Sequence, residues 1–484
     1  MAAESIPVRV RIAPSPTGYL HLGTIRTALF NYLFAKKEEG AFIVRIEDTD
    51  KERSLPIFEQ DILDGLKNLG LMWDEGPDVG GTYGPYRQSE RKDVYKIHLQ
   101  KLLDEKRAYW CYCTKEELEE QKQAMLSSGV FPKYGGVCRH LSLEEQKQKQ
   151  EEGRSRVIRL AVPTNAEIEF ADIIRGKISI NSDTIGDFVI ARDVDDPLYN
   201  FAVVVDDAQM KITHVIRGED HISNTPRQIL ISRALGVPEP KYAHLPLILA
   251  PDRTKMSKRK METSFNEYLK EGYLPEAIIN FLALLGWHPE DEKEVFSLEE
   301  IIEKFSLKRV QKAGAIFNTE KLDWFNAEYI KELPLEILVQ RMDRYVPEHW
   351  KENKVLFEKA LEVERPRLKK LSDFEANARF FFEPESYESE LLIWGKMDKK
   401  EVVENLKSAR SVIEDINEKS FEIRALESAL MALTQEKGRG EVLWPLRVAL
   451  SGKKNSPGPF EILGVLGKEE SIRRVDYALQ KLSE

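Results

Sequence analysis

The chain has 484 residues, of which 42% are hydrophobic and 32% are charged, and its formal net charge is −10. Such values are typical of a soluble globular protein of about three domains, and no apolar run reaches the roughly 18 residues of a membrane span. The negative net charge does not indicate a nucleic-acid partner, but it excludes none, because a local basic groove is hidden in a global sum.

The cysteines and the N-terminal residues bear on the cellular compartment. Three cysteines are too few, and an odd number, for a disulfide framework. Residues 1–7 lack the basic and apolar segments of a secretory signal. Together these features predict a protein of the reducing cytoplasm.

The first strand and helix of the chain meet at a polar junction, residues 11–24. Apolar and basic side chains alternate before it, which predicts a strand, and apolar residues recur at helical spacing after it. His21, Gly23 and Thr24 stand at the start of this helix, where unpaired backbone N–H groups can bind an anion. The motif is short, and His21 could equally be a surface or core histidine. Phosphate binding is therefore a hypothesis that needs support from the rest of the chain.

The second predicted strand, residues 42–48, places Glu47 at the same edge of the sheet as Arg11. Helices are predicted over residues 58–69 and 91–106, with a glycine-rich loop between them. This strand–helix order is typical of an α/β domain, in which ligands bind where the parallel strands end.

All three cysteines fall in one segment that also holds a histidine. Cys111 and Cys113 are followed, after 24 intervening residues, by Cys138 and His140. Zinc prefers four such ligands in a tetrahedron, and residues two apart in an extended chain point the same way. The sequence therefore predicts a structural zinc site. The alternative is ordinary buried cysteines with an unrelated histidine.

Residues 108–196 are predicted to be an insertion that separates two halves of the α/β domain. It contains a charged helix and strand-like segments at 157–162, 168–170, 177–180 and 188–191. Residues 199–207 then form a nearly continuous apolar run, which predicts a parallel strand buried on both faces. A strand at 212–221 and a helix at 226–235 complete a doubly wound parallel sheet.

A basic segment, residues 251–259, follows the second half of the sheet. Lys255, Ser257, Lys258 and Arg259 could surround a polyphosphate, although a solvated basic loop would have the same composition. From residue 268 onward the pattern is helical, with helices predicted at 274–286, 300–304, 335–345, 353–362, 399–415, 421–437 and 468–482.

The His-x-Gly-Thr motif at His21 and the Lys-Met-Ser-Lys-Arg motif at Lys255, on either side of a split sheet, together resemble the class I aminoacyl-tRNA synthetases. The residues around these two motifs resemble those of the bacterial-type glutamyl-tRNA synthetases. The matching runs cover essentially the whole chain and are residues 11–18, 42–50, 84–91, 199–207, 215–221, 365–367, 445–447 and 459–463.

This resemblance implies the fold class and the domains. The fold would be α/β, with a Rossmann-type doubly wound parallel sheet split by an α+β zinc-containing insertion and followed by an all-α anticodon-binding region. The expected domains are the first half of the catalytic domain (1–107), the acceptor-end and zinc insertion (108–196), the second half of the catalytic domain (197–248), the basic loop with a helical stem-contact domain (249–333), and the anticodon-binding region (334–484).

The resemblance also implies a reaction in two steps. Glutamate attacks ATP to form glutamyl-adenylate and pyrophosphate, and the glutamyl group then passes to the terminal adenosine of tRNA(Glu). No covalent enzyme nucleophile is needed, so catalysis rests on positioning and charge stabilisation. His21, Gly23 and Thr24 would hold ATP, which Mg²⁺ accompanies. The residues that would close over the phosphates are Lys255, Ser257, Lys258 and Arg259.

The substrate side chain is a carboxylate, and the resemblance places two arginines in its pocket. Arg11 and Arg217 would clamp it, because a guanidinium can donate two parallel hydrogen bonds to a carboxylate. Ser15 and Tyr199 would add hydrogen bonds, and Glu47 would face the α-ammonium group. The alternatives are a solvated strand residue for Arg11, an ion pair with Glu219 or Asp220 for Arg217, and a pairing with Arg45 for Glu47.

Zinc and tRNA contacts follow from the same resemblance. Zinc at the Cys111, Cys113, Cys138 and His140 set would be structural, in a module that approaches the tRNA acceptor end. Arg365 and Arg367 lie where the family reads the third anticodon base, and Arg367 is favoured; the alternative is a phosphate contact or surface charge. A monomer is expected, with no membrane contact. Lys260-Met261 stands where many members have His-Gly, which leaves the local loop geometry open.

Other functions stay open at this stage. A sister enzyme that also glutamylates tRNA(Gln) would have the same motifs. A glutaminyl enzyme is less compatible, because its anticodon domains are β-rich and this C-terminal half is not. A catalytically silent RNA-binding paralogue is opposed by the intact His21, Lys255 and Lys258.

Overall fold

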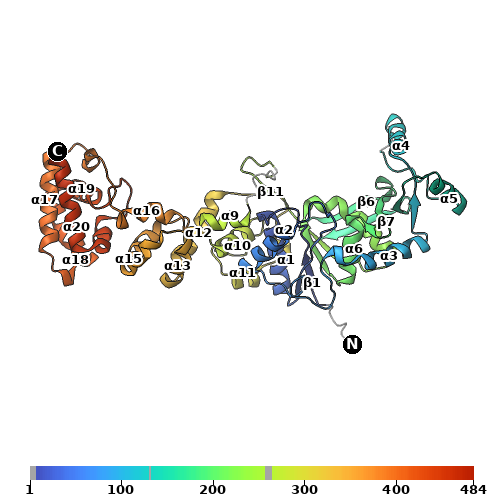
Figure 1. Ribbon diagram of the computed structural model, residues 1–484, viewed down its shortest axis with the longest axis horizontal. Coiled ribbons are helices and arrows are strands. Elements are labelled where there is room, and N and C mark those ends of the chain that lie inside the picture. The colour runs from blue at the N-terminus through green and yellow to red at the C-terminus, as the bar shows by residue number, and fades with distance from the viewer. Residues whose placement is uncertain (1–6, 130–131, 255, 257–263, 484) are drawn as a thin grey trace. The chain divides into compact units, whose positions relative to one another are not determined.

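The computed structural model describes residues 7–129, 132–254, 256 and 264–483 (Figure 1). The chain divides into two compact units, one formed by Met1–Glu267 and Ile278–Thr319 and the other by Tyr268–Ala277 and Glu320–Glu484. We refer to them as unit 1 and unit 2. Among the described residues, none of the helices combines the length and the apolar character needed to cross a membrane.

Unit 1 is built on parallel strands. β1 (Arg9–Ile12) pairs with β2 (Ala41–Val44), and β9 (His214–Gly218) pairs with β10 (Lys241–Leu245). A backbone hydrogen bond from Thr213 N to Arg9 O joins the start of β9 to β1. The two halves of the predicted sheet therefore adjoin each other, although residues 45–213, which include the insertion predicted at 108–196, separate them in sequence.

Helix α1 (Leu22–Lys37) covers this sheet as the sequence predicted. It packs against β1, β2 and β9, and its N-cap is His21, whose Nδ1 accepts a hydrogen bond from Thr24 N at 3.4 Å. Lys36 and Lys37 lie in its last turn, where cations interact favourably with the helix dipole. The junction of strand and helix is thus fixed by a capping side chain that is also a predicted ligand residue.

The segment predicted as a third parallel strand, residues 199–207, is a helix. This helix, α6 (Tyr199–Gln209), packs against α3 (Lys92–Asp104), α7 (Thr225–Leu235) and β7 (Val189–Asp193). A continuous apolar run is compatible with a strand or a helix when it is buried on most sides, and here tertiary packing overrides the β-propensity of three consecutive valines. The prediction of a strand was wrong for this reason.

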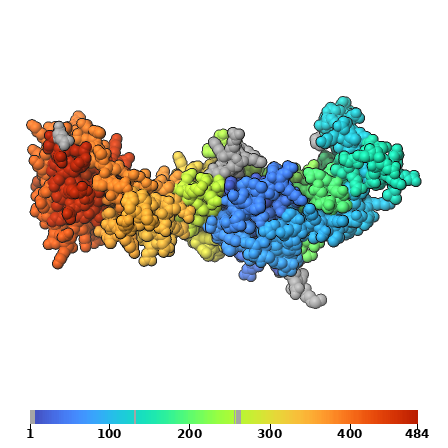
Figure 2. Space-filling view, in the orientation of Figure 1, coloured from blue at the N-terminus to red at the C-terminus, as the bar shows by residue number. Residues whose placement is uncertain are grey.

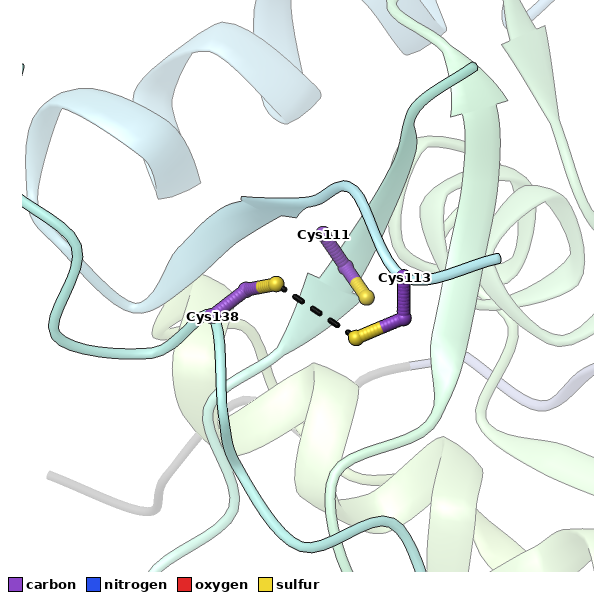
Figure 3. A group of neighbouring side chains, drawn as sticks. All are labelled: Cys111, Cys113 and Cys138. Atoms are coloured by element: carbon purple, nitrogen blue, oxygen red, sulfur yellow. Dashed lines mark hydrogen bonds between the residues drawn. The ribbon is translucent and has the colours of Figure 1, made fainter. Parts of the chain in front are cut away.

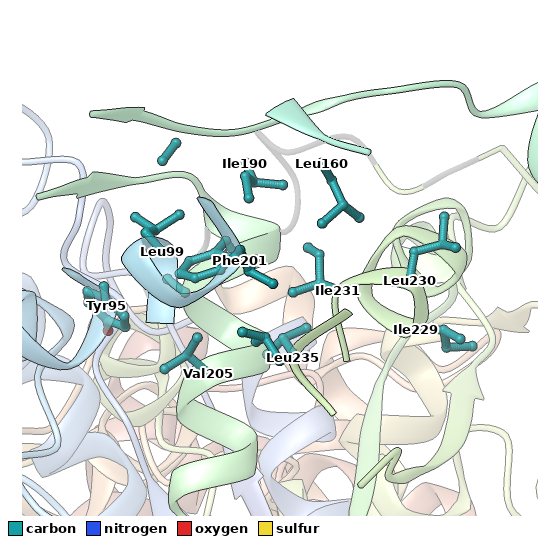
Figure 4. Packing of buried hydrophobic residues seen from close by; sticks show 14 of the residues in the cluster. Tyr95, Leu99, Leu160, Ile190, Phe201, Val205, Ile229, Leu230, Ile231 and Leu235 are labelled. Carbon is teal, nitrogen blue, oxygen red and sulfur yellow. The ribbon is translucent and has the colours of Figure 1, made fainter. Parts of the chain in front are cut away.

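A cluster of buried apolar side chains lies around α6. Phe201 and Val205 from α6 meet Tyr95 and Leu99 from α3, with Ile231 from α7 beside them (Figure 4). Side chains from strands β4 (Val157–Leu160) and β7 close the cluster. Core packing of this kind fixes the orientation of α6, and hence of the polar residues at its two ends.

The insertion forms an antiparallel sheet and also extends the sheet of the catalytic half. β3 (Ala108–Cys111), β4, β7 and β8 (Asp196–Pro197) form one sheet in that order. β5 (Glu167–Asp172) instead pairs with β10, with β6 (Gly176–Asn181) outside it. Helices α4 (Lys115–Ser127) and α5 (Leu143–Glu151) bury no side chain and stand out from the rest of unit 1 (Figures 1 and 2).

Unit 1 also contains a short parallel strand pair that was not predicted. β11 (Ile248–Leu249), which precedes the basic segment in sequence, pairs with β12 (Ala315–Ile316), although the pattern from residue 268 onward predicted helices. The other helices before residue 319 are α2 (Pro56–Asn68), α9 (Phe265–Glu271), α10 (Pro275–Leu284) and α11 (Leu298–Lys304).

Unit 2 is helical throughout its described residues, as predicted. Its helices α17, α18, α19 and α20 pack against one another. The helices from residue 319 onward are α12 (Thr319–Glu332), α13 (Leu335–Arg341), α14 (Glu348–Glu352), α15 (Lys354–Glu364), α16 (Asp373–Phe382), α17 (Lys399–Asp415), α18 (Ile423–Lys437), α19 (Arg439–Ser451) and α20 (Pro459–Ser483), the last with a non-helical Gly467.

Candidate active site

A cavity of about 400 Å³ opens in unit 1 where β1 and β9 end and α1 begins. This is the edge of a parallel sheet at which α/β proteins bind ligands. The cavity brings together every described residue that the sequence assigned to ATP or glutamate, namely Arg11, Ser15, His21, Gly23, Thr24, Glu47, Tyr199 and Arg217.

Arg11 enters the cavity wall from β1, held from behind by Asp207. Its Nε donates to Asp207 Oδ1 at 3.1 Å, and its Nη2 lies 3.4 Å from Oδ2. Both side chains are buried. Burial would raise the pKa of Asp207, but Arg11 and Arg45 outweigh it and lower that pKa, so the carboxylate is ionised. Arg11 is therefore a fixed, buried cation and not a solvated strand residue.

Glu47 belongs both to the cavity and to this ionic group. Its Oε1 accepts a hydrogen bond from Arg45 Nη2 at 3.0 Å, while the residue also lines the cavity. Burial raises the pKa of Glu47, against the attraction of Arg45 and Arg11. Pairing with Arg45 and facing the cavity are thus compatible, because a carboxylate has several acceptor positions.

Arg217 is another buried cation of the cavity, which Arg26 also lines. Its Nε donates to His244 Nε2 at 3.2 Å and its Nη2 to Thr225 Oγ1 at 2.8 Å. Nη1 is buried and has no hydrogen-bond acceptor among the described residues. Desolvation lowers the pKa of Arg217. In the described part of the chain Arg217 makes no ion pair with Glu219 or Asp220, and Glu219 pairs instead with Arg175.

A buried guanidinium N–H without an acceptor is costly, so it marks a place where a ligand completes the hydrogen bonding. Tyr199, on the first turn of α6, lies at the same cavity, and its hydroxyl is 3.2 Å from His221 Nδ1. Burial raises the pKa of Tyr199 to about 12, so it stays a neutral donor. Of the three arginines that line the cavity, Arg11 and Arg217 lie on the strand side, and together with the Tyr199 phenol they suit a carboxylate ligand.

The opposite wall of the cavity is the N-terminus of α1. Gly23, Thr24 and the cap residue His21 line it, and the Thr24 hydroxyl lies 3.2 Å from His21 Nε2. Unpaired backbone N–H groups and the helix dipole make this end suitable for an anion such as a phosphate.

The basic residues Lys255, Ser257, Lys258 and Arg259 lie outside the described residues. The described residues on either side of them reach the cavity. Ile248 lines it before the segment, and Ser264 forms a β-bridge with His21 after it.

Some side chains of the site were not identified from the sequence. Asp207 holds Arg11, and His244 and Thr225 hold Arg217. For Asp207 a signal existed, because an aspartate pair that ends a buried apolar run must find partners. For His244 the sequence offered none, since its role depends on the pairing of β9 with β10.

The three cysteines of the insertion lie together, as the zinc prediction required (Figure 3). Their sulfur atoms are all within 4.8 Å of one another, and Sγ of Cys113 is 3.6 Å from Sγ of Cys138. Thiolates around one tetrahedral zinc would be about 3.8 Å apart, from a Zn–S bond of about 2.3 Å. The three sulfur atoms therefore fit a zinc ion.

His140 is not brought into this group. Residues 137–140 form a turn, so Cys138 and His140 do not project on the same side as they would in an extended chain, and His140 is exposed. The Tyr134 hydroxyl lies 3.4 Å from Cys111 Sγ and 3.5 Å from Cys113 Sγ. Hydrogen bonds from Cys138 and Tyr134 lower the pKa of the Cys111 thiol.

In unit 2, the two arginines expected at the anticodon have different surroundings. Arg365 donates to three carbonyl oxygens just beyond and at the end of α12, those of Ile330, Lys331 and Leu333. Arg367 is exposed, and its Nε lies 3.2 Å from the buried Glu364 carboxylate. Arg365 is thus used to cap a helix, whereas Arg367 presents its guanidinium at the surface.

Comparisons with known proteins agree with this architecture. Residues 7–324 match the family "tRNA synthetases class I (E and Q), catalytic domain", and residues 325–479 match an anticodon binding domain. The chain belongs to the class I tRNA synthetases (E and Q). The first match spans unit 1 with its insertion, and the second spans most of the helical unit 2.

Individual members of this class I synthetase family match the chain over nearly its whole length. Glutamate–tRNA ligase of Carboxydothermus hydrogenoformans is 46% identical over 483 residues, covering 97% of this chain and 99% of the relative. Glutamate–tRNA ligase 2 of Caldanaerobacter subterraneus subsp. tengcongensis is also 46% identical, covering 97% and 98%. A crystal structure of a glutamate tRNA ligase from Elizabethkingia meningosepticum, in complex with its amino acid, has a TM-score of 0.87 at 36% identity, covering 99% of this chain and 100% of that chain.

Proposed function

We propose that this class I synthetase ligates L-glutamate to tRNA(Glu), with ATP as the energy source and Mg²⁺ bound to the ATP. The glutamate α-carboxylate attacks the α-phosphorus of ATP, and pyrophosphate leaves. A hydroxyl of the terminal adenosine of tRNA then attacks the glutamyl carbonyl, and AMP leaves. The observation that carries the proposal is the buried Nη1 of Arg217, a cationic donor without an acceptor among the described residues, in a cavity that adjoins the N-terminus of α1.

The cavity then binds two substrates, glutamate and ATP, side by side. Arg11 and Arg217 bind the γ-carboxylate, and Ser15 and Tyr199 add hydrogen bonds. Glu47, one of the acidic residues that line the cavity, takes the α-ammonium group. The fixed positions of Arg11 on Asp207 and of Arg217 on His244 support these roles, since preorganised donors cost no reorganisation on binding.

ATP takes the helix side of the cavity. His21, Gly23 and Thr24 hold it at the N-terminus of α1, and Lys255, Ser257, Lys258 and Arg259 close over the phosphates. Lys258 follows the negative charge that develops as pyrophosphate leaves. The β-bridge between Ser264 and His21 supports this role, because Ser264 follows the basic segment closely in sequence and lies beside His21.

The proposed function also includes a zinc site in the insertion and a tRNA contact in unit 2. Zinc held by Cys111, Cys113 and Cys138 has a structural role in the insertion, and the spacing of the three sulfur atoms supports it. His140, which lies on the adjacent turn outside this group, is the proposed fourth ligand. Arg367 reads the third anticodon base, supported by its exposure and by the use of Arg365 as a helix cap. We also propose the domain roles expected from the sequence, a monomeric state and a cytoplasmic location.

Aminoacylation with purified components tests the function. Protein, ATP, Mg²⁺ and labelled glutamate are incubated with a transcript of tRNA(Glu) or of tRNA(Gln). We expect alkali-labile glutamate on tRNA(Glu), and none when ATP is omitted or when glutamine replaces glutamate. Absence of glutamyl-tRNA(Glu) would refute the function. Equal charging of tRNA(Gln) would instead identify an enzyme that charges both tRNAs.

A further inference from the structure

A chain of four buried side chains runs behind the glutamate cavity and ends on Arg217. Asp172 lies at the end of β5, His244 on β10 and Arg217 on β9, and all three strands belong to one sheet. His244 and Arg217 are register partners across β9 and β10. Thr225, at the start of α7, is the fourth member. All four side chains are buried.

The hydrogen bonds of this chain determine where the His244 proton lies. Arg217 Nε can only donate, and it lies 3.2 Å from His244 Nε2, so Nε2 must be an acceptor. The ring proton is then on Nδ1, which lies 2.6 Å from Asp172 Oδ2. A neutral ring is also what burial favours, since desolvation lowers the pKa of His244.

Asp172 is itself fixed independently of the ring. Its Oδ1 accepts from the backbone N–H groups of Ile174 and Arg175, at 2.9 and 2.7 Å. Its Oδ2 also accepts from the backbone N–H of His244 at 3.1 Å. The carboxylate is thus a rigid acceptor that selects one tautomer of His244.

Thr225 fixes the other side of the guanidinium. Its Oγ1 accepts from Arg217 Nη2 at 2.8 Å, and it lies 3.2 Å from His221 O and 3.1 Å from His244 Nε2, either of which can accept the hydroxyl proton. With Nε and Nη2 both engaged, the guanidinium plane cannot rotate, and the remaining donor is Nη1, which lacks an acceptor among the described residues.

We infer that His244 is a positioning residue for substrate glutamate, acting through Arg217, with its acceptor state at Nε2 set by Asp172. This inference rests on the proposed function, because it assumes that Arg217 binds the γ-carboxylate. Asp172 belongs to the predicted insertion, so that segment contributes to the amino-acid pocket as well as to the approach of tRNA. A side chain at position 244 that cannot accept a hydrogen bond should weaken glutamate binding and leave ATP binding unchanged.

Two variants at one position separate hydrogen bonding from packing. In His244→Gln the amide oxygen can take the place of Nε2 and accept from Arg217, whereas His244→Leu has no acceptor. In both variants Asp172 keeps its three backbone donors. We expect His244→Leu to raise KM for glutamate at least about 10-fold with KM for ATP unchanged, and His244→Gln to stay within about threefold of the wild type. Wild-type KM for glutamate in His244→Leu would overturn the inference, as would equal losses in the two variants or a parallel rise in KM for ATP.

Nitrogen chemical shifts provide a test that does not depend on activity. The protein is labelled with ¹⁵N-histidine, and the His244 signals are assigned by their loss in His244→Gln. We expect the neutral Nδ1–H tautomer, and an Nε2–H or doubly protonated ring would overturn the inference even if His244→Leu does not fold. Failure of the proposed function would look different, because the wild type itself would then form no glutamyl-tRNA.

Discussion

Asp207 Oδ1 lies 2.6 Å from Arg45 Nη1 in the interior of unit 1, and neither side chain is appreciably exposed. The same carboxylate holds Arg11. Arg45 also binds Glu47, so one buried ionic group connects α6 with β1 and with the residues just after β2, and it reaches the cavity. Removing one member of such a group leaves an uncompensated buried charge, which costs far more than an exposed ion pair contributes.

The first prediction concerns stability. Asp207→Asn should destabilise unit 1 by about 3–5 kcal/mol, because Arg11 and Arg45 lose their shared counter-charge. Urea unfolding followed by tryptophan fluorescence measures this change. Glu151→Gln is the control, because Glu151 is exposed and pairs with Lys147 at 3.8 Å, and it should leave the transition unchanged. A similar midpoint for Asp207→Asn and wild type would show that the buried group is not important for stability.

The second prediction concerns pH. His214 is buried next to the Phe34 ring, and desolvation, aided by Lys241, lowers its pKa to about 4. Since an unfolded histidine has a pKa of about 6.5, only the unfolded state gains a proton between pH 6.5 and 4. Stability is therefore fully present above pH 6.5 and falls as the pH drops towards 4, by about 3 kcal/mol from this residue.

His214→Gln removes this proton uptake and provides the comparison. Unfolding free energies of wild type and variant are measured at several pH values from 7.5 to 4. The difference between the two curves should change across pH 6.5–4, with the wild type losing more stability. Parallel curves would contradict the buried neutral state of His214.

The third prediction concerns zinc. Dialysed protein should retain about one zinc per chain, and Cys138→Ser should lose it, because three thiolates are the core of the set. His140→Gln and Tyr134→Phe compare the two candidates near the sulfur atoms. We expect weaker zinc binding in His140→Gln, since imidazole is a preferred zinc ligand, and little change in Tyr134→Phe. Full activity in protein without zinc would contradict a zinc site. Weaker zinc binding in Tyr134→Phe than in His140→Gln would identify Tyr134 as the ligand.

The fourth prediction concerns the anticodon. Arg367→Ala should lower kcat/KM for tRNA(Glu) by about 5–150-fold, the effect of losing a specific base contact, without changing KM for glutamate. The loss should shrink when the third anticodon base is substituted. Arg365→Ala should mainly destabilise unit 2, because Arg365 caps α12. A loss in Arg367→Ala that is the same for every third base would indicate a phosphate contact.

Much of the architecture could be predicted because local patterns agree with the packing. Strand β5 of the insertion and helix α17 of unit 2, for example, have periodicities that match their burial, and α1 could be predicted from the signals at its two ends. Helix α6 could not be identified, because an apolar run buried on most sides has no periodicity that separates helix from strand.

Side-chain partners were harder to predict than elements. The cavity residues were found through their motifs, but the residues behind them come from elements far apart in sequence. Asp207 is 196 residues from Arg11, and Asp172 is 72 residues from His244. The orientation of His140 depends on a turn at 137–140, and Cys-x-His spacing alone does not specify that turn.

The central claim is that two buried arginines select a carboxylate side chain, and the ratio of kcat/KM for glutamate and glutamine tests it most directly. Wild-type protein and Arg217→Ala are assayed with both amino acids on tRNA(Glu). We predict that the wild type prefers glutamate by at least about 10³-fold, and that Arg217→Ala loses most of its glutamate activity while KM for ATP stays unchanged. Unchanged glutamate KM and kcat in Arg217→Ala, or similar use of the two amino acids by the wild type, would contradict the account.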